Sequence, residues 1–201
     1  MKIYLIRHGS TLQNETRLVV GDADQSSLTS LGIKELKLLK KRLPKPSQMD
    51  KIIISDDVST KQSGKILFPN RSLVVKSFLN EINKGFLFLS KTRNNDLKMT
   101  VDEWERKYNN NRDAKIRLKF KYPSGLSIEK FCGHVFNVFG GMLKGKIKGN
   151  LFIVSHNGPI KAIICRLLGD LTLYYKLSIL NGCYSEFEYS EKYRKLLKLN
   201  A

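Results

Sequence analysis

Apolar runs alternate with amphipathic stretches along this chain, and the alternation predicts strands separated by helices. Short, mainly apolar runs predict buried strands at residues 2–6, 51–55, 72–76 and 150–154. Leucines interleaved with lysines from Leu28 to Leu43 predict an amphipathic helix, which Pro44 and Pro46 end. Strands and helices in this order are typical of a three-layer α/β/α fold, in which helices cover both faces of a mostly parallel sheet.

The same apolar and amphipathic patterns predict three further helices and a hairpin near the end of the sequence. The helices are expected at residues 56–69, 124–143 and 158–168. The pair Asp56-Asp57 favours a helix start because carboxylates stabilise the exposed amides of the first turn. We expect the pair Gly140-Gly141 to end or fray its helix. Alternation in residues 183–189 and 194–199 predicts a hairpin at the edge of the sheet.

Residues 81–122 are the least regular part of the sequence, and we expect a lid-like insertion there. A helix is predicted inside it over residues 100–108, between two groups of asparagines. With 201 residues, of which 41% are hydrophobic, the chain is long enough to bury one sizeable core. We therefore expect a single domain over residues 1–201.

The formal net charge of +18 permits three interpretations: contact with nucleic acid, attraction to acidic membranes, or steering of anionic substrates. Most of the charge is lysine scattered along the chain, and the interleaved aromatic side chains of a single-strand binder are not evident. We therefore disfavour nucleic-acid binding. Solvated lysine faces that also speed encounter with an anionic substrate are the preferred interpretation.

No apolar stretch approaches the length needed to cross a bilayer, so we expect no membrane partner. The first predicted strand begins at Lys2, and we expect no signal peptide and a cytoplasmic protein. The cysteines are widely spaced and lack a metal-ligand pattern, which favours reduced thiols packed in the core: Cys132, Cys165 and Cys183. The sequence does not specify an oligomeric state.

Two histidines follow directly on two of the predicted strands. Arg7, His8 and Gly9 come after the first strand, and His156 comes just after the strand at residues 150–154. Because the carboxyl ends of parallel strands meet at one edge of an open α/β sheet, we expect both imidazoles to meet there. An imidazole can attack phosphorus, and a neighbouring guanidinium can hold the phosphoryl oxygens. The pattern indicates phosphoryl-transfer chemistry.

These motifs resemble those of the histidine phosphatase superfamily, in the branch of cofactor-dependent phosphoglycerate mutases and small-molecule phosphatases. The family's opening Arg-His-Gly-x-Thr-x-x-Asn is matched by residues 7–14 without a mismatch, and its late Ser-His-x-Gly by residues 155–158. Supporting matches are shorter, and they are Gly21 to Asp24, Leu28 to Gly32, and the acidic stretch with Leu79, Glu81 and Gly85.

The resemblance implies a phosphatase that uses neither a metal nor another cofactor. By this resemblance, His8 is expected to become phosphorylated, Arg7 and His156 to hold the phosphoryl group, and Glu81 to protonate the leaving oxygen. The implied partner is a small anionic phosphate ester. Its further contacts are expected from polar residues and a glycine around the mouth of the site: Thr11, Asn14, Ser59, Asn157 and Gly158.

Two segments depart from the family pattern. The family's Ser-x-x-x-Arg-x-x-Gln-Thr falls on residues 55–63, where Ser59 replaces the second phosphate-binding arginine. Lys61 is a poor substitute because it points to a different face of the helix. The family's Pro-x-Gly-Glu-Ser falls on residues 123–127, with Leu126 in place of glutamate. Two alternatives stay open: an impaired relative that binds a phosphorylated ligand or a protein partner, and, less favoured, a phosphoglycerate mutase-type phosphomutase.

Overall fold

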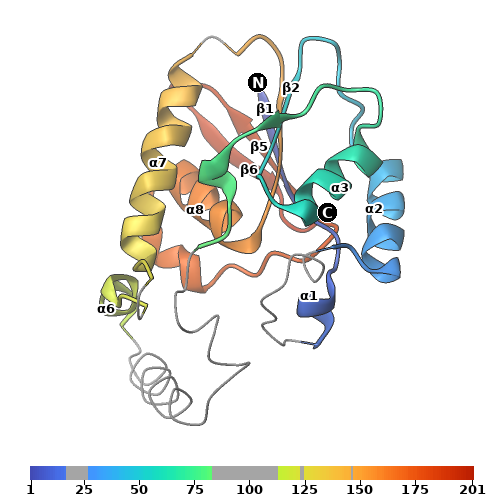
Figure 1. Ribbon diagram of the computed structural model, residues 1–201. Helices are drawn as coiled ribbons and strands as arrows, with labels where there is room; N and C mark the ends of the chain where they lie inside the picture. The colour runs from blue at the N-terminus through green and yellow to red at the C-terminus, as the bar shows by residue number, and fades with distance from the viewer. Residues whose placement is uncertain (17–26, 83–112, 123–124, 146) are drawn as a thin grey trace.

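A six-stranded sheet forms the centre of the computed structural model, which describes residues 1–16, 27–82, 113–122, 125–145 and 147–201 (Figure 1). The strand order is β3-β2-β4-β1-β5-β6. Neighbours from β3 to β1 run parallel, whereas β5 is antiparallel to both β1 and β6. The strands are β1 (Lys2–Arg7), β2 (Lys51–Ile54), β3 (Val74–Val75), β4 (Leu151–Ser155), β5 (Tyr184–Tyr189) and β6 (Arg194–Lys198).

Helices cover both faces of this sheet. In Figure 1, α2 and α3 lie on one side of the strands, and α7 and α8 lie on the other. The described α-helices are α1 (Leu12–Thr16), α2 (Ser30–Arg42), α3 (Val58–Leu67), α6 (Ala114–Lys119), α7 (Ile128–Lys144) and α8 (Asn157–Leu168), and the 3₁₀ helices are η2 (Ser77–Leu79) and η3 (Leu171–Tyr175).

Side chains of β1 alternate between two hydrophobic cores, as the period of a strand requires. Ile3 and Leu5 pack in the core on the α7 and α8 side, whereas Tyr4 and Ile6 pack in the core on the α2 and α3 side. Burial on both faces explains why the strand is continuously apolar. The predicted three-layer α/β/α fold with a mostly parallel sheet is confirmed.

Several predicted boundaries agree with the structure, and one strand is shorter than expected. Thr29 caps α2 by accepting the N–H of Gly32, and Asp57 caps α3. The predicted hairpin is formed by β5 and β6, with β6 at the edge of the sheet. The strand expected at residues 72–76 contracts to β3, whose two valines are both 44% exposed at the other edge.

The glycine pair in α7 does not end the helix, so that prediction was wrong. Helix α7 begins at Ile128, after the capping side chain of Ser127, and continues through Gly140 and Gly141 to Lys144. Each glycine costs a helix about 1 kcal/mol relative to alanine. Fully buried side chains on the inner face of α7, such as Phe139, outweigh that cost because they pack into the core.

Parts of the predicted insertion and of the weaker motifs lie outside the described residues. These are Gly85, the helix expected at residues 100–108, the segment from Gly21 to Asp24, and residues 123–124. Inside the described part of the insertion, α6 is a helix that the sequence did not predict. The lid-like role of residues 81–122 and the single-domain organisation remain predictions.

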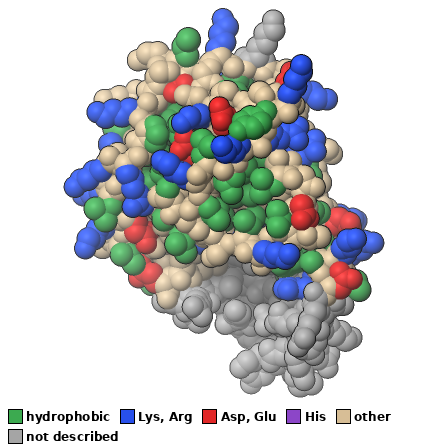
Figure 2. Space-filling view, turned by 180° about the vertical axis from the view of Figure 1, so that it is seen from behind, with side chains coloured by type: hydrophobic (Ala, Val, Ile, Leu, Met, Phe, Trp, Pro, Cys, Tyr) green, Lys and Arg blue, Asp and Glu red, His purple; other side chains and the backbone are tan. Residues whose placement is uncertain are grey.

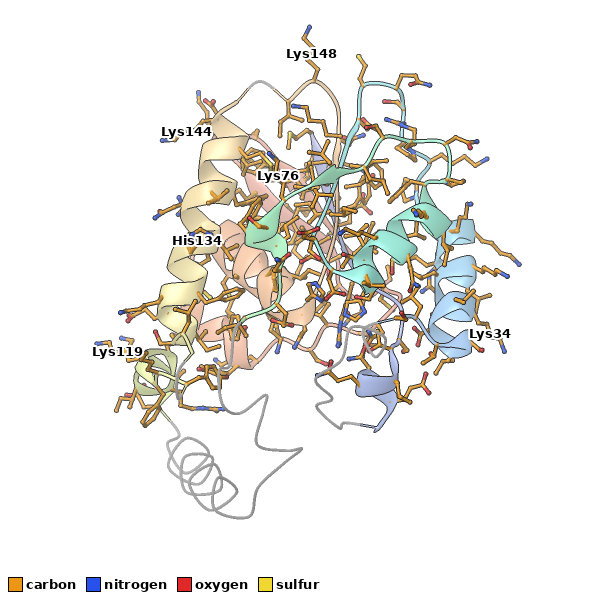
Figure 3. The ribbon with its side chains drawn as sticks, viewed as in Figure 1. Lys34, Lys76, Lys119, His134, Lys144 and Lys148 are labelled. Atoms are coloured by element: carbon orange, nitrogen blue, oxygen red, sulfur yellow. The ribbon has the colours of Figure 1, made fainter. Side chains whose placement is uncertain are left out.

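Positive charge is spread over several sides of the molecule. Figure 2 shows Lys and Arg side chains scattered over the coloured part of one face, interspersed with carboxylates and apolar side chains. In Figure 3, Lys34 lies on α2, Lys119 on α6 and Lys144 at the end of α7, which are far apart on the ribbon. His134 is exposed on α7, and it lies far from Lys34 on α2 (Figure 3). None of the helices in the described ranges is long and apolar enough to cross a membrane.

Candidate active site

Three neighbouring strands end at the same edge of the sheet and bring the two predicted histidines together. The N–H of His8 donates to the carbonyl of Ser155 at 3.0 Å, directly before His156. The N–H of Ser55, at the end of β2, donates to the carbonyl of Val154 at 3.1 Å. The two imidazole rings lie edge to face, with centroids 5.0 Å apart. The ends of β1, β4 and β2 therefore form one polar site.

His8 is buried and uncharged. Its Nδ1 lies 2.7 Å from the carbonyl oxygen of Gly9. A carbonyl oxygen only accepts, so Nδ1 carries the proton and Nε2 keeps a lone pair. Burial lowers the pKa of His8 to about 3, and the neighbouring His156 and Arg7 act in the same direction. A neutral imidazole with a free lone pair is a nucleophile near pH 7.

The backbone around His8 is held from the side of β4 and β5. The carbonyl of His8 accepts two hydrogen bonds, from the N–H of Gly182 at 3.1 Å and from Nδ2 of Asn181 at 3.0 Å. Gly182 has a φ of +59°, a left-handed conformation that glycine adopts without strain. The Asn181-Gly182 turn therefore fixes the carbonyl that precedes the turn at Gly9.

The next two residues are held from the side of α2 and α3. The N–H of Gly9 donates to Oγ of Ser63 at 3.3 Å, and the carbonyl of Ser10 accepts the N–H of Thr29 at 3.0 Å. The two backbones approach so closely that a Cβ on Gly9 would lie 2.5 Å from the carbonyl oxygen of Gly32. This approach gives the Leu28 to Gly32 motif its physical role, which is to seat α2 against the loop.

His156 is held by a chain of hydroxyl groups. Its Nε2 lies 2.8 Å from Oγ of Ser55, which lies 2.8 Å from Oγ1 of Thr60. Thr60 donates its proton to the carbonyl of Asp57 at 2.8 Å, so Ser55 donates to Thr60 and accepts from Nε2–H of His156. Burial lowers the pKa of His156, and the carboxylates of Glu81 and Asp57 oppose that shift.

Arg7 presents an unsatisfied donor at the same edge. Its Nη1 donates to the carbonyl of Ile179 at 2.6 Å. Its Nε is buried and has no hydrogen-bond partner among the described residues. Burial lowers the pKa of Arg7, whereas the carboxylates of Glu81 and Glu35 act to raise it. A buried N–H without a partner is costly, and a phosphoryl oxygen would satisfy it.

Glu81 lies against the first turn of α8. Its Oε2 accepts the N–H of Gly158 at 3.1 Å, and its Oε1 accepts the N–H of Ile82 at 2.9 Å. A Cβ on Gly158 would lie 2.0 Å from Oε1 of Glu81 and 3.2 Å from the hydroxyl of Tyr174. The absence of a side chain at position 158 therefore leaves the space that the carboxylate fills.

Ser59 occupies the arginine position without offering a free donor. It is 2% exposed, and both its N–H and its hydroxyl donate to Oδ1 of Asp57, at 2.9 and 2.6 Å. Nζ of Lys61 forms an ion pair with Asp56 at 2.6 Å. Within the described part of the chain, Arg7 is the cation that acts on the pKa of both histidines.

The other expected substrate contacts lie around the same strand ends. Oγ1 of Thr11 donates to Oδ1 of Asn14 at 3.1 Å, and the same oxygen accepts Nδ2 of Asn181 at 3.1 Å. Asn157 is the first residue of α8, and its buried Oδ1 has no hydrogen-bond partner among the described residues. Thr11 and Asn14 therefore support the His8 loop, whereas Asn157 lies beside Gly158 and the second histidine.

The sequence did not reveal the residues that support this site. Glu35, Ser63, Asn181 and Gly182 all bond to or pack against the His8 loop. Asn181-Gly182 carried a usable signal, because an Asn-Gly pair is typical of tight turns with positive φ. The described residues contain no group of three or more His, Cys, Asp or Glu side chains placed to hold a metal ion.

The buried neutral His8 is expected to make the protein less stable in acid. Between pH 6.5 and about 3, the unfolded chain binds a proton at His8 that the folded chain excludes. The free energy of unfolding therefore falls by up to about 1.4 kcal/mol per pH unit over this window. Urea unfolding at pH 6.5, 5.5 and 4.5 should show a shallower fall for His8→Gln. His134→Gln, at an exposed position, should follow the wild type; equal slopes for all three proteins would contradict the assignment.

A family model of the histidine phosphatase superfamily (branch 1) matches residues 3–201. The chain belongs to the histidine phosphatase superfamily. It is similar to a probable phosphoglycerate mutase, GpmB, of Yersinia pestis, with 26% identity over 194 residues that cover 95% of this chain and 86% of the relative.

Two solved structures share the fold of this chain. A putative alpha-ribazole-5'-P phosphatase from Escherichia coli superposes with a TM-score of 0.82 at 22% identity, covering 100% of this chain and 96% of that one. A phosphoserine phosphatase from Entamoeba histolytica, in complex with 3-phosphoglyceric acid, gives a TM-score of 0.77 at 20% identity, with coverage of 100% and 96%. These superpositions show that the chain shares its fold with both solved structures.

Proposed function

We propose that this protein is a phosphatase that hydrolyses a small phosphate ester through a phosphohistidine at His8, without a metal. The observation that carries the proposal is the state of His8, which is neutral, protonated on Nδ1 and left with a lone pair on Nε2. Beside it, the buried Nε of Arg7 lacks a partner, which suits a phosphoryl oxygen. Membership of the superfamily supports the same reaction.

In the first step, the Nε2 lone pair of His8 attacks phosphorus and the bond to the leaving oxygen breaks. Glu81, which reacts in its protonated form, gives its proton to that oxygen, so the alcohol departs neutral and Glu81 becomes a carboxylate. Arg7 balances the charge on the phosphoryl oxygens, and His156 donates to them from Nδ1 once the bound dianion has favoured its protonated form. In the second step, water attacks phosphorus, Glu81 takes a proton from the water, and the P–N bond breaks. Inorganic phosphate leaves and His8 regains its lone pair.

Hydrolysis is favoured over mutase action, although a relative at 26% identity is named as a probable phosphoglycerate mutase. A mutase must retain its phosphohistidine and bind its substrate in two orientations. The segment at residues 123–127 has the exposed Leu126 where the family has glutamate. This departure gives no reason to expect retention of the phosphohistidine or rebinding of the product.

The test is intact-mass spectrometry after brief incubation with a panel of small phosphate esters, together with an assay of phosphate release. The incubation is kept at neutral pH because phosphohistidine is acid-labile. A phosphate-sized mass increase with release of inorganic phosphate supports the proposal and indicates the substrate class. If turnover requires magnesium or zinc, the metal-free mechanism is wrong.

Ser59 favours a second candidate function, in which an impaired relative binds a phosphorylated ligand or a protein partner. Its hydroxyl is already committed to Asp57, so this position supplies neither charge nor a free donor. Loss of a charge-assisted donor from such a pocket costs about 2–4 kcal/mol in transition-state binding, or a rate factor of roughly 30 to 1000.

The variant Ser59→Arg is expected to raise the phosphatase rate by roughly 30- to 1000-fold, because it restores a second cation beside the phosphoryl group. Steady-state assays of kcat and KM give the measurement. Ser190→Arg, which adds the same charge in the exposed turn between β5 and β6, is the matched control. No activity in wild type or in Ser59→Arg favours the binding role over the enzyme.

A further inference from the structure

Glu35 is the charged residue that holds the His8 loop from the side of α2. Its Oε2 accepts the N–H of Ser10 at 2.8 Å, and its Oε1 accepts the hydroxyl of the same residue at 2.8 Å. Both oxygens of one carboxylate are therefore committed to one residue of the loop. Glu35 is partly buried and its carboxylate faces the His8 loop, whereas Lys34 and Lys37 on the same helix are exposed.

The same side chain is packed against the support on the other side of the loop. A Cβ on Gly182 would lie 2.6 Å from Cβ of Glu35. Gly182 in turn donates its N–H to the carbonyl of His8 at 3.1 Å. Glu35 thus supports the loop in two ways. It forms hydrogen bonds to Ser10, and it packs against Gly182, which is bonded to the carbonyl of His8.

Every backbone N–H and C=O from His8 to Ser10 has a hydrogen-bond partner, so the loop has no unsatisfied backbone group. The N–H of His8 goes to β4, its carbonyl to the Asn181-Gly182 turn, and the N–H of Gly9 to Ser63. The carbonyl of Gly9 accepts Nδ1–H of His8. Glu35 takes the N–H of Ser10, and without it this donor would be left buried and unpaired.

We propose that Glu35 is a positioning residue, which acts through Ser10 to hold the Gly9 carbonyl where it orients the imidazole of His8. The inference rests on the proposed function of His8 as nucleophile. The hydrogen bonds of Glu35 do the positioning. Its charge has a separate effect, because a carboxylate beside Arg7 weakens the pull of that guanidinium on a phosphoryl dianion.

Two variants separate these effects. Glu35→Ala removes both acceptors, and kcat is expected to fall roughly 10- to 100-fold while KM does not rise. Glu35→Gln keeps an acceptor for the Ser10 N–H and offers an N–H to the Ser10 hydroxyl, so kcat should recover to within about threefold of wild type. Glu188→Ala, at an exposed position on β5, is the matched control for loss of a glutamate.

A second readout does not depend on turnover. NMR titration of the His8 imidazole should show its pKa, about 3 in the wild type, rising by at least about one unit in Glu35→Ala, since a loosened loop admits water. Glu35→Gln should leave the titration close to that of the wild type. A variant that merely lowered overall stability would reduce the folded fraction without moving the pKa of His8.

Either of two results would overturn the proposal. The first is a Glu35→Ala protein with unchanged kcat and an unchanged His8 titration. The second is a Glu35→Gln protein as impaired as Glu35→Ala, because charge would then matter and the hydrogen bonds would not. If the wild type forms no phosphohistidine, the proposed function fails, but the His8 titration still decides the positioning role.

Discussion

Replacement of His8 by alanine is expected to abolish the phosphoenzyme and to lower phosphate release by about four orders of magnitude or more. The reason is that Nε2 of His8 supplies the electron pair for the new bond to phosphorus, and the carbonyl of Gly9 fixes which nitrogen is free. Intact mass and phosphate release, measured on wild type and variant with the same ester, test this directly.

His134→Ala is the matched control, because it removes an exposed imidazole from α7 and leaves the strand ends untouched. It should form the adduct at the wild-type rate. The geometry also predicts the site of modification within the ring: phosphorus should be found on Nε2 of His8, since Nδ1 is bonded to Gly9. A persistent adduct in His8→Ala, or modification of Nδ1, would show that another group or another orientation carries the reaction.

The second large effect is expected from Gly158→Ala. The added Cβ would lie 2.0 Å from Oε1 of Glu81, which must then move. The obstructing atom is the end of a flexible side chain, so the fold tolerates the methyl group and the acid is displaced instead. Loss of a positioned general acid lowers the rate by about 10²–10⁴-fold.

The identity of the leaving group makes this prediction specific. An alkyl phosphate needs a proton on its departing oxygen, whereas p-nitrophenyl phosphate leaves as a stabilised anion and does not. Gly158→Ala should therefore lose far more activity with the alkyl ester, and Glu81→Gln should show the same contrast. Gly133→Ala is the control, because a Cβ at that position on α7 meets nothing within 4 Å. Equal losses with both substrates would exclude Glu81 as the acid.

The central part of the site was predictable because each histidine follows an apolar strand. Parallel strands bring their carboxyl ends to one edge whatever the details of packing, so His8 and His156 had to meet once β1 and β4 were neighbours. Glu81 was found through a short motif rather than through a strand end, and its contact with Gly158 depends on tertiary packing. The roles of these residues remain predictions.

The supports of the site were not predictable by the same means. Glu35 sits in a helix that the sequence marks only as amphipathic, and its inward direction follows from the seating of α2 against Gly9. Ser59 was expected to keep a donor for substrate, but the capping of α3 by Asp57 engages its hydroxyl. For Glu35 the local pattern gives the helix, while its partner Ser10 comes from another part of the chain. For Ser59 the partner is the nearby capping residue Asp57, which was assigned from the sequence only to the start of the helix.

The extent of α7 was mispredicted for a related reason. Local preference disfavours Gly140 and Gly141 in a helix, whereas burial of Val135 and Phe139 on the sheet is a property of the assembled protein. For the edge strand β3 the prediction was too long instead of too short. A strand was expected over residues 72–76, but only Val74 and Val75 pair with β2.

The way in which the His8 loop is held also affects when the site forms during synthesis. A ribosome makes His8 long before its backbone partners Ser155, Asn181 and Gly182, which lie far along the sequence. A nascent chain therefore carries His8 without a finished pocket until Gly182 has emerged. The reactive centre is therefore assembled late, and chains truncated before Asn181 should be inert rather than partly active.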